Sequence, residues 1–405
     1  MPKFSYISRN QTGQIIKGEI EVKNEEALAA YLKEQDLTLT SSKLERKKSD
    51  LKLGSFLNRF QSIPITQKIF FVNNLEVMMR TGFSIGRALG VLAEQTSSKK
   101  LKAIILNLKE EVESGVSFAK ALEKHKKYFS DLFINMIAAG EASGKLDEVL
   151  KRLAVQMKKD HTLIAKIKGA LTYPIIVVVA MIGVGVAMIV MVIPQLAAVF
   201  KEAGVSLPLL TQILIDLSSF FINYGLWLAP AFVVFIILLR RFLKTKKGKF
   251  YWHKIQLKLP IFAPIIKKVN LARFSRSLNS LLSTDIPIVK TFEIIARVLG
   301  NVHYQNAVRE AAEKLKTGAT VEKCLKIYPQ LFTPIILQMI SVGEESGTLD
   351  SISEEIAIFY EEEVEQTMSN LSTIIEPVLM LVLGAGVAAM AAAVILPIYS
   401  LSEAI

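Results

Sequence analysis

The sequence predicts a mainly all-α integral membrane protein with two homologous cytoplasmic helix bundles, three transmembrane helices and a small N-terminal α/β domain. Three observations support this prediction. The chain contains three long apolar segments without charge, an internal repeat with a constant offset, and an N-terminal region in which short strands alternate with a turn.

Residues 1–42 form the predicted α/β domain, which we expect to be cytoplasmic. Residues 4–8 and 15–22 have the pattern of two short strands joined by a polar turn. Residues 24–35 follow as a helix capped by Asn24. No signal peptide is expected, since the first fifty residues are polar. The basic linker that follows, residues 43–61, is interpreted either as a segment on the membrane surface or as the first bundle helix.

The internal repeat is the most informative feature of the chain. The segment GEASGKLD from Gly140 to Asp147 recurs as GEESGTLD from Gly343 to Asp350, an offset of 203 residues. The same offset relates these further pairs: Phe71 and Phe274, Leu75 and Leu278, Thr81 and Thr284, Gly115 and Gly318, Pro174 and Pro377. Register held over this distance predicts a tandem duplication of one helical domain with one membrane span.

Each soluble repeat is predicted to be a helix bundle. Apolar residues recur at helical spacing from Phe71 and again from Phe274. Gly144 and Gly347 are expected to end one helix in a left-handed conformation. The next helix then starts near Leu146 or Leu349 and runs towards the membrane as a stalk.

The predicted spans are residues 171–194, 220–239 and 374–399, each long enough to cross the hydrocarbon layer. Basic residues precede the first span and follow the second, which predicts a cytoplasmic N-terminus and an external C-terminus. The non-repeated middle span returns the chain, so both bundles face the cytoplasm. The remaining predicted segments are bundle 1 with its stalk (62–168), an external loop (195–219), a basic cytoplasmic linker (240–264), bundle 2 with its stalk (265–372) and an external tail (400–405).

The repeated segment is a candidate partner-facing or structural loop. Its candidate residues are Glu141, Gly144, Asp147, Glu344, Gly347 and Asp350. A phosphate-binding loop is excluded, because three residues instead of four separate the glycines and Leu146 follows Lys145. The alternative to a partner contact is a structural role, in which Glu141 and Glu344 are negative charges that the dipole at a nearby helix N-terminus favours.

The stalks carry opposite charge at equivalent positions. Lys151, Arg152, Lys158 and Lys159 of the first stalk correspond to Glu354, Glu355, Glu361 and Glu362 of the second. We hypothesise that the two stalks pair, within or between chains, although the lysines also satisfy the positive-inside rule.

Pro174 and Pro377 are hinge candidates. Glu376 is a carboxylate at the membrane edge, where it is interpreted either as a functional residue or as a side chain solvated among the headgroups.

Composition argues against several other functions. Cys324 is alone and is expected to be a small core residue, and the four histidines lack metal-ligand spacing. We expect no cofactor, no metal and no enzymatic activity. The net charge of +12 is interpreted as a topology signal, with no nucleic-acid partner expected because aromatic and basic residues do not interleave.

Together these motifs resemble the GspF/PilC family of inner-membrane platform proteins of type II secretion and type IV pilus systems. The resemblance rests on both GExSGxLD segments, on Tyr173-Pro174 before the apolar run to Pro194, and on the turn from Thr81 to Ile85. It implies no catalysis and places the chain in the bacterial inner membrane. The implied partners are a cytoplasmic assembly ATPase, pilin or pseudopilin transmembrane helices, other inner-membrane assembly proteins, the lipid bilayer and further copies of the chain as a homo-oligomer. The second copy departs from the pattern at Glu376, where the first has Tyr173. A transporter or channel subunit is the alternative, because transporters also use internal repeats.

Overall fold

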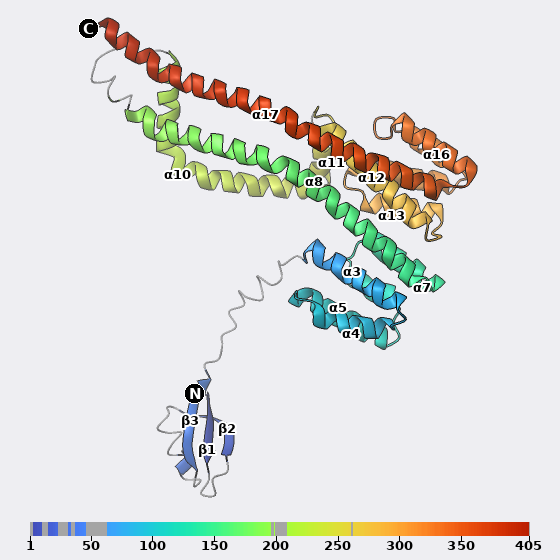
Figure 1. Cartoon of the computed structure of the whole chain (residues 1–405). Coiled ribbons are helices and arrows are strands. Elements are labelled where there is room, and N and C mark those ends of the chain that lie inside the picture. The colour runs from blue at the N-terminus through green and yellow to red at the C-terminus, as the bar shows by residue number, and fades with distance from the viewer. Residues whose placement is uncertain are drawn as a thin grey trace. The chain divides into compact units, whose positions relative to one another are not determined.

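The computed structural model describes residues 3–9, 15–22, 31–33, 37–45, 63–195, 198, 209–260 and 262–404 (Figure 1). The chain divides into two compact units, Met1–Ser62 and Ile63–Ile405.

The N-terminal unit contains a three-stranded antiparallel sheet with the strand order β2-β1-β3. Its strands are β1 (Lys3–Arg9), β2 (Ile15–Glu21) and β3 (Thr38–Glu45). The first two were predicted, whereas β3 was not and reaches past residue 42, where the linker was expected to begin. Leu32 is fully buried in the helical residues 31–33. The rest of the helix predicted at 24–35, and residues 46–61 of the predicted linker, lie outside the described residues.

The first bundle consists of short helices joined by turns. The residues of the turns explain why each helix ends where it does. Its helices are α3 (Ile65–Arg80), α4 (Ile85–Gln95), α5 (Lys99–Glu113), α6 (Phe118–Glu123), α7 (Asp131–Ser143) and the start of α8 (Leu146–Ala187). Gly82 has φ +85° after α3, and Ser84 then precedes α4. A residue without a Cβ accepts this left-handed geometry with little strain.

The second bundle has the same elements in the same order. They are α12 (Phe262–Leu282), α13 (Ile288–Val298), α14 (Val302–Leu315), α15 (Val321–Lys326), α16 (Pro334–Ser346) and α17 (Leu349–Ala404). The two stalk helices begin at Leu146 and Leu349, as predicted. The repeat in the sequence is therefore a repeat in the fold.

The buried side chains of the two bundles form one hydrophobic cluster. The predicted core residues Phe71, Leu75, Phe274 and Leu278 are all almost fully buried in it. An ion pair also joins the bundles, since an Asp131 carboxylate oxygen on α7 lies 3.5 Å from Arg297 Nε on α13. The bundles thus share a core.

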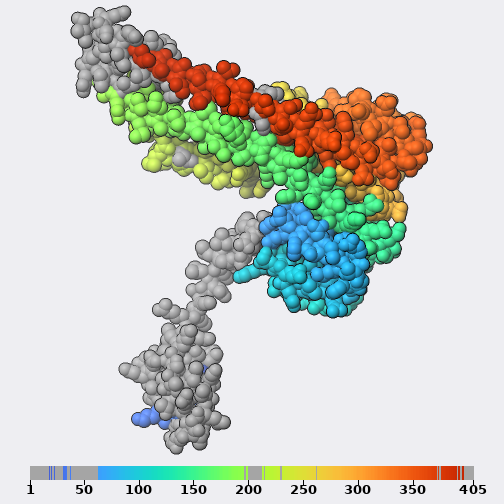
Figure 2. All heavy atoms as spheres, viewed as in Figure 1, coloured from blue at the N-terminus to red at the C-terminus, as the bar shows by residue number. Residues whose placement is uncertain are grey.

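The stalk helices continue from this core into the apolar segments. α8 passes through Pro174 and continues as a π-helical turn at Met188–Val192. It lies beside α17, as Figure 1 and Figure 2 show. Among the described residues, two helices are long and apolar enough to cross a membrane. The middle predicted span, residues 220–239, lies in α10 (Leu209–Lys244), whose parts Ile215–Leu228 and Pro230–Lys244 meet at a 60° bend.

The hinge hypothesis for Pro174 and Pro377 stays a prediction. Both prolines lie inside continuous helices, α8 and α17, whereas the 60° bend of α10 falls at Pro230. A proline in a helix interior removes one hydrogen bond and crowds the preceding turn, which accounts for a break at that position.

The region predicted as a basic linker, 240–264, contains a further helix, α11 (Lys246–Gln256). α11 packs on α14, where the Val302 N–H donates to His253 Nδ1 at 3.0 Å. The ring of Phe250 also lies 4.5 Å from the ring of His303. The dense lysines of this stretch indicated a solvated connection, but its aromatic residues attach it to the second bundle.

Candidate functional site

The two copies of the repeated segment, residues 140–147 and 343–350, form equivalent turns, called here the signature turns. Gly144 and Gly347 both have φ +71° and end α7 and α16, as predicted. In each turn one carbonyl accepts the closing hydrogen bond at 2.9 Å, Gly140 from Lys145 N–H and Gly343 from Thr348 N–H.

The first glycine of each signature turn allows two helices to approach closely. A Cβ on Gly140 would lie 2.8 Å from Val149 Cγ2, and one on Gly343 would lie 3.1 Å from Ile352 Cβ. The next helix therefore starts against the previous one, with no room for a methyl group at Gly140 and only a tight fit for one at Gly343. Asp147 and Asp350 lie in the first turn of α8 and α17, where the helix dipole favours a negative charge.

The glutamate of the first signature turn caps a different helix. Glu141 Oε1 accepts the Phe118 N–H at 2.7 Å, and Oε2 accepts the Ala119 N–H at 3.0 Å. These are unpaired donors at the N-terminus of α6, where a carboxylate is also favoured by the helix dipole. Glu141 thus joins α7 to α6 across 23 positions of sequence.

Glu344 does the same in the second copy. Its Oε1 accepts the Val321 N–H at 2.8 Å and its Oε2 the Glu322 N–H at 3.3 Å, at the start of α15. The carboxylates are therefore engaged within the bundles, whereas residues 142–145 and 345–348 are exposed. The structural contacts account for most of the motif, and contact of a partner with these turns stays a prediction.

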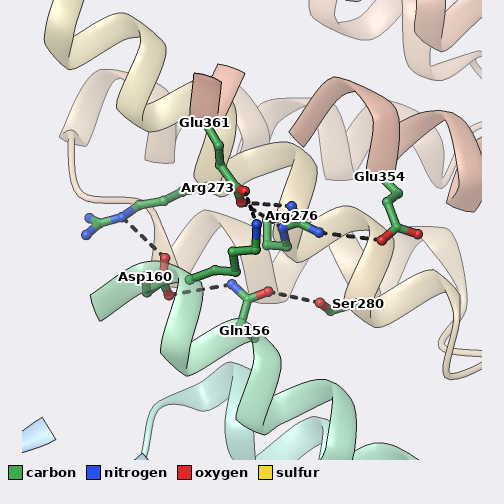
Figure 3. A network of polar contacts seen from close by, with 8 residues as sticks. Gln156, Asp160, Arg273, Arg276, Ser280, Glu354 and Glu361 are labelled. Atoms are coloured by element: carbon green, nitrogen blue, oxygen red, sulfur yellow. Dashed lines mark hydrogen bonds and ion pairs between the residues drawn. The ribbon is translucent and has the colours of Figure 1, made fainter. Parts of the chain in front are cut away.

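A second polar site lies where α8 packs between α12 and α17 (Figure 3). The Ser280 hydroxyl donates to Gln156 Oε1 at 2.9 Å, and Gln156 Nε2 donates to Asp160 Oδ2 at 3.5 Å. Desolvation raises the pKa of Asp160, and the nearby Arg273 guanidinium opposes this rise. Gln156 is itself buried, so its contacts fix how α8 lies on α12.

Arg276 is the buried charge of this site. Only 8% of its side chain is exposed, and its Nη2 and Nε lie 2.8 Å and 2.9 Å from Glu361 Oε1. Glu354 Oε1 lies 3.7 Å from Nη1. A buried guanidinium requires such partners, because an unpaired charge away from water is costly.

The hypothesised stalk residues divide into three groups. Lys159 Nζ lies 3.1 Å from Glu361 Oε2, which links α8 to α17 directly. Lys151, Arg152 and Glu354 line an open cleft of about 510 Å³ between α8, α12 and α17. The remaining residues, Lys158, Glu355 and Glu362, are exposed.

Towards the apolar segments, the stalk contact continues through charges and then through apolar side chains. Lys166 Nζ lies 2.5 Å from Glu365 Oε2. An apolar cluster follows, made of Leu163, Ile265, Val364, Met368 and Leu371. Glu376 lies beyond this cluster, exposed on α17, and its functional role stays a prediction.

Sequence reasoning missed Gln156, Asp160, Arg273, Arg276 and Ser280. One signal was available, because Arg276 occupies the position that Asn73 occupies in the first copy. Such a charge inside an otherwise repeated helical pattern indicates a contact that one copy makes and the other does not. In the part of the chain that the structure describes, no group of three or more His, Cys, Asp or Glu side chains is arranged to hold a metal ion.

The capping role of Glu141 predicts a specific loss of stability. Glu141→Ala leaves two donors of α6 without their acceptor and should lower the free energy of unfolding by about 1–2 kcal/mol. Thermal unfolding of the detergent-solubilised protein would measure this. Glu345→Ala is the control, since its exposed carboxylate accepts only from the Ser341 hydroxyl among the described residues. Equal losses in both variants would contradict the capping role.

Glu361 and Glu362 are adjacent in sequence but should differ in their effect on stability. Glu361→Gln removes the main partner of Arg276 and should cost about 2–3 kcal/mol of unfolding free energy. Glu362→Gln should change it by less than about 0.5 kcal/mol, because that side chain is exposed. The same thermal measurement compares them, and an equal shift would show that Arg276 does not depend on Glu361.

Comparison with known proteins agrees with the duplicated architecture. The family described as type II secretion system (T2SS), protein F matches residues 71–194 and again residues 274–397, and its N-terminal domain matches residues 1–43. The second match begins and ends 203 positions after the first. The type IV pilus assembly protein PilC of Myxococcus xanthus is 33% identical over 406 residues, covering 100% of this chain and 96% of the relative. PilC of Thermus thermophilus is 32% identical over 408 residues, covering 99% and 98%.

A relative from a secretion system aligns along the whole chain as well. The type II secretion system protein F of Vibrio cholerae is 29% identical over 408 residues, covering 100% of this chain and 99% of the relative. The predicted resemblance is thereby confirmed, and the chain belongs to the type II secretion system protein F family, the GspF/PilC family.

Proposed function

We propose that this chain is the inner-membrane platform of a type IV pilus or type II secretion machine, coupling a cytoplasmic ATPase to the insertion of pilin or pseudopilin subunits. The names of its relatives, pilus assembly protein and secretion system protein, support this assignment. The observation that carries it is that both stalk helices run from a folded bundle into an apolar segment without a break at either proline.

When one end of a continuous helix moves, the other end moves with it. At 1.5 Å per residue, the 56 residues of α17 measure about 84 Å. Movement of the bundles would therefore reach the apolar segments without passing through a flexible loop. This is the mechanical property that a platform between an ATPase and a membrane substrate requires.

The orientation follows from charge. Lysines before residue 171 and the basic run after residue 239 support a cytoplasmic location for both bundles, with three spans and an external C-terminus. The exposed residues of the signature turns would then face the cytoplasm. They are the surface that we assign to the ATPase.

The apolar segments suit contact with other helices in the membrane. Ile176, Val179 and Leu381 are more than 60% exposed in the isolated chain, so lipid or a pilin helix can cover them. A transporter would need charged or polar side chains along its spans near the midplane. Residues 171–195 and 377–399 contain no charged side chain, which favours the platform.

Binding of the assembly ATPase of the same organism tests the proposal. We expect the full-length protein in detergent to form a complex of defined mass with that ATPase. Ala142→Arg with Glu345→Arg should weaken binding at least about tenfold, because both place a bulky cation on exposed parts of the signature turns. Ala142→Ser with Glu345→Gln is the conservative control, and these positions avoid the capping carboxylates.

Three outcomes are distinct. Binding that both pairs of variants retain would support the platform but contradict the assignment of the signature turns. Absence of a complex, together with solute flux through the protein in liposomes, would replace the platform with the transporter. Loss of binding in the arginine variants alone supports both parts of the proposal.

A further inference from the structure

The two copies touch each other within the chain. For each residue in that contact, the offset of 203 gives the counterpart in the other copy, so each contacting pair has an equivalent pair elsewhere on the molecule. Within the chain, a ridge on α8 that includes Gln156 and Lys159 lies against Ser280 of α12 and Glu361 of α17. The equivalent ridge lies on α17 and contains Phe359 and Glu362. The equivalent groove lies between α3 and α8 and contains Val77 and Lys158. These are called here the second ridge and the first groove.

Side chains of the second ridge and of the first groove are partly exposed. Glu362 also borders a cleft between α8 and α17 that Lys159 lines. Phe359 is 38% exposed and Val77 is 44% exposed, although both are large apolar side chains on well-formed helices. Lys158 and Glu362 are also exposed, and neither has an ion-pair partner among the described residues. Their counterparts Gln156 and Ser280 are buried and Glu361 is half-buried in the contact within the chain. Lys159, the counterpart of Glu362, stays exposed even in its ion pair.

The apolar pair has changed on both sides together. Inside the chain, the Ser280 hydroxyl meets the Gln156 amide in a buried polar contact. At the equivalent positions, Val77 and Phe359 are both apolar. A polar pair replaced by an apolar pair keeps the two surfaces complementary, because neither leaves a buried polar group without a partner.

The charged pair has changed in the same concerted way. Inside the chain, Lys159 of the ridge faces Glu361 of the groove. At the equivalent positions the ridge carries Glu362 and the groove carries Lys158, so the two signs are exchanged. Attraction is retained, whereas a change on one side alone would have produced repulsion.

Phe70 extends the apolar part of the first groove. It stands where the second copy has Arg273 and is 49% exposed, two helical turns from Val77 on α3. Two exposed apolar side chains at this spacing form a stripe that another helix can cover.

We propose that the second ridge of one molecule lies in the first groove of a second copy of this chain. The contact between molecules then repeats the packing already present between the two copies inside each molecule. Such an interface is heterologous, using different surfaces on the two partners, and it closes into a ring when the rotation permits. It also keeps the stalks parallel, as the α8–α17 contact does within the chain. Self-association of this kind is independent of the proposed ATPase contact.

Disulfide formation between singly substituted chains tests the proposal. Two differently tagged full-length chains are expressed together in membranes, both with Cys324→Ala to remove the single native cysteine. One carries Val77→Cys and the other Phe359→Cys, so any bond between the two tags joins two molecules. Mild oxidation should give a crosslinked heterodimer, since cysteines form a disulfide only when their Cα atoms lie within about 7 Å.

The control replaces Val77→Cys with Val342→Cys, a valine 52% exposed on α16 and outside the groove. Crosslinking of the Val77→Cys chain that does not exceed crosslinking of the Val342→Cys chain would overturn the proposal. The ATPase is absent from the experiment, so this result leaves the platform function untouched.

Charge exchange provides the second measurement. Lys158→Glu on the Val77→Cys chain should lower crosslinking about fivefold, equivalent to about 1 kcal/mol. Adding Glu362→Lys to the Phe359→Cys chain should restore it. Lack of restoration, with unchanged thermal unfolding of each variant, would show that these two side chains do not meet.

Discussion

Burial of the Arg276 guanidinium is the constraint on which the packing of the stalks depends. A charge with so little exposure is tolerated only beside its partners, and both of them come from α17. Glu361 in turn holds Lys159, so the same carboxylate fixes α8 as well. One side chain on α12 thereby sets the register of two helices that are far apart in sequence. In that register Leu163 of α8 and Val364 of α17 lie in the same apolar cluster beyond the charges.

Duplication supplied two similar bundles, and divergence made them fit each other. The repeated elements keep their order, the glycines that end α7 and α16, and their capping glutamates, whereas Asp285 (φ +58°) stands where the first copy has Gly82. The copies differ where they touch, since the second has Arg276 and Ser280 where the first has Asn73 and Val77. If both copies had identical surfaces, a charged residue in one would face the same charge in the other. Because the side chains differ at these positions, each copy can recognise the other, and the two repeated units form one ordered pair.

Local signals predicted the parts of the fold that local chemistry determines. Gly144 and Gly347 were identified from sequence because a left-handed helix end favours glycine whatever surrounds it. The partner of Glu141 could not be found in this way, since its acceptor role depends on a helix 23 residues upstream that only tertiary packing brings close. Likewise, Glu361 and Glu362 are adjacent residues of the same type, and only the position of α12 distinguishes the half-buried partner of Arg276 from the exposed charge. The helix α11 was missed because its lysines resemble those of a solvated linker.

The shared core of the two bundles has a geometric consequence for the membrane segments. Bundles that share a core would turn together, and each stalk leaves that core as a continuous helix. A rotation of about 5° at the base would displace the far end of a helix about 84 Å long by about 7 Å. That displacement is sideways, perpendicular to the helix axis. Long stalks would therefore turn a small change of angle at the bundles into a lateral movement comparable to the distance between packed helices.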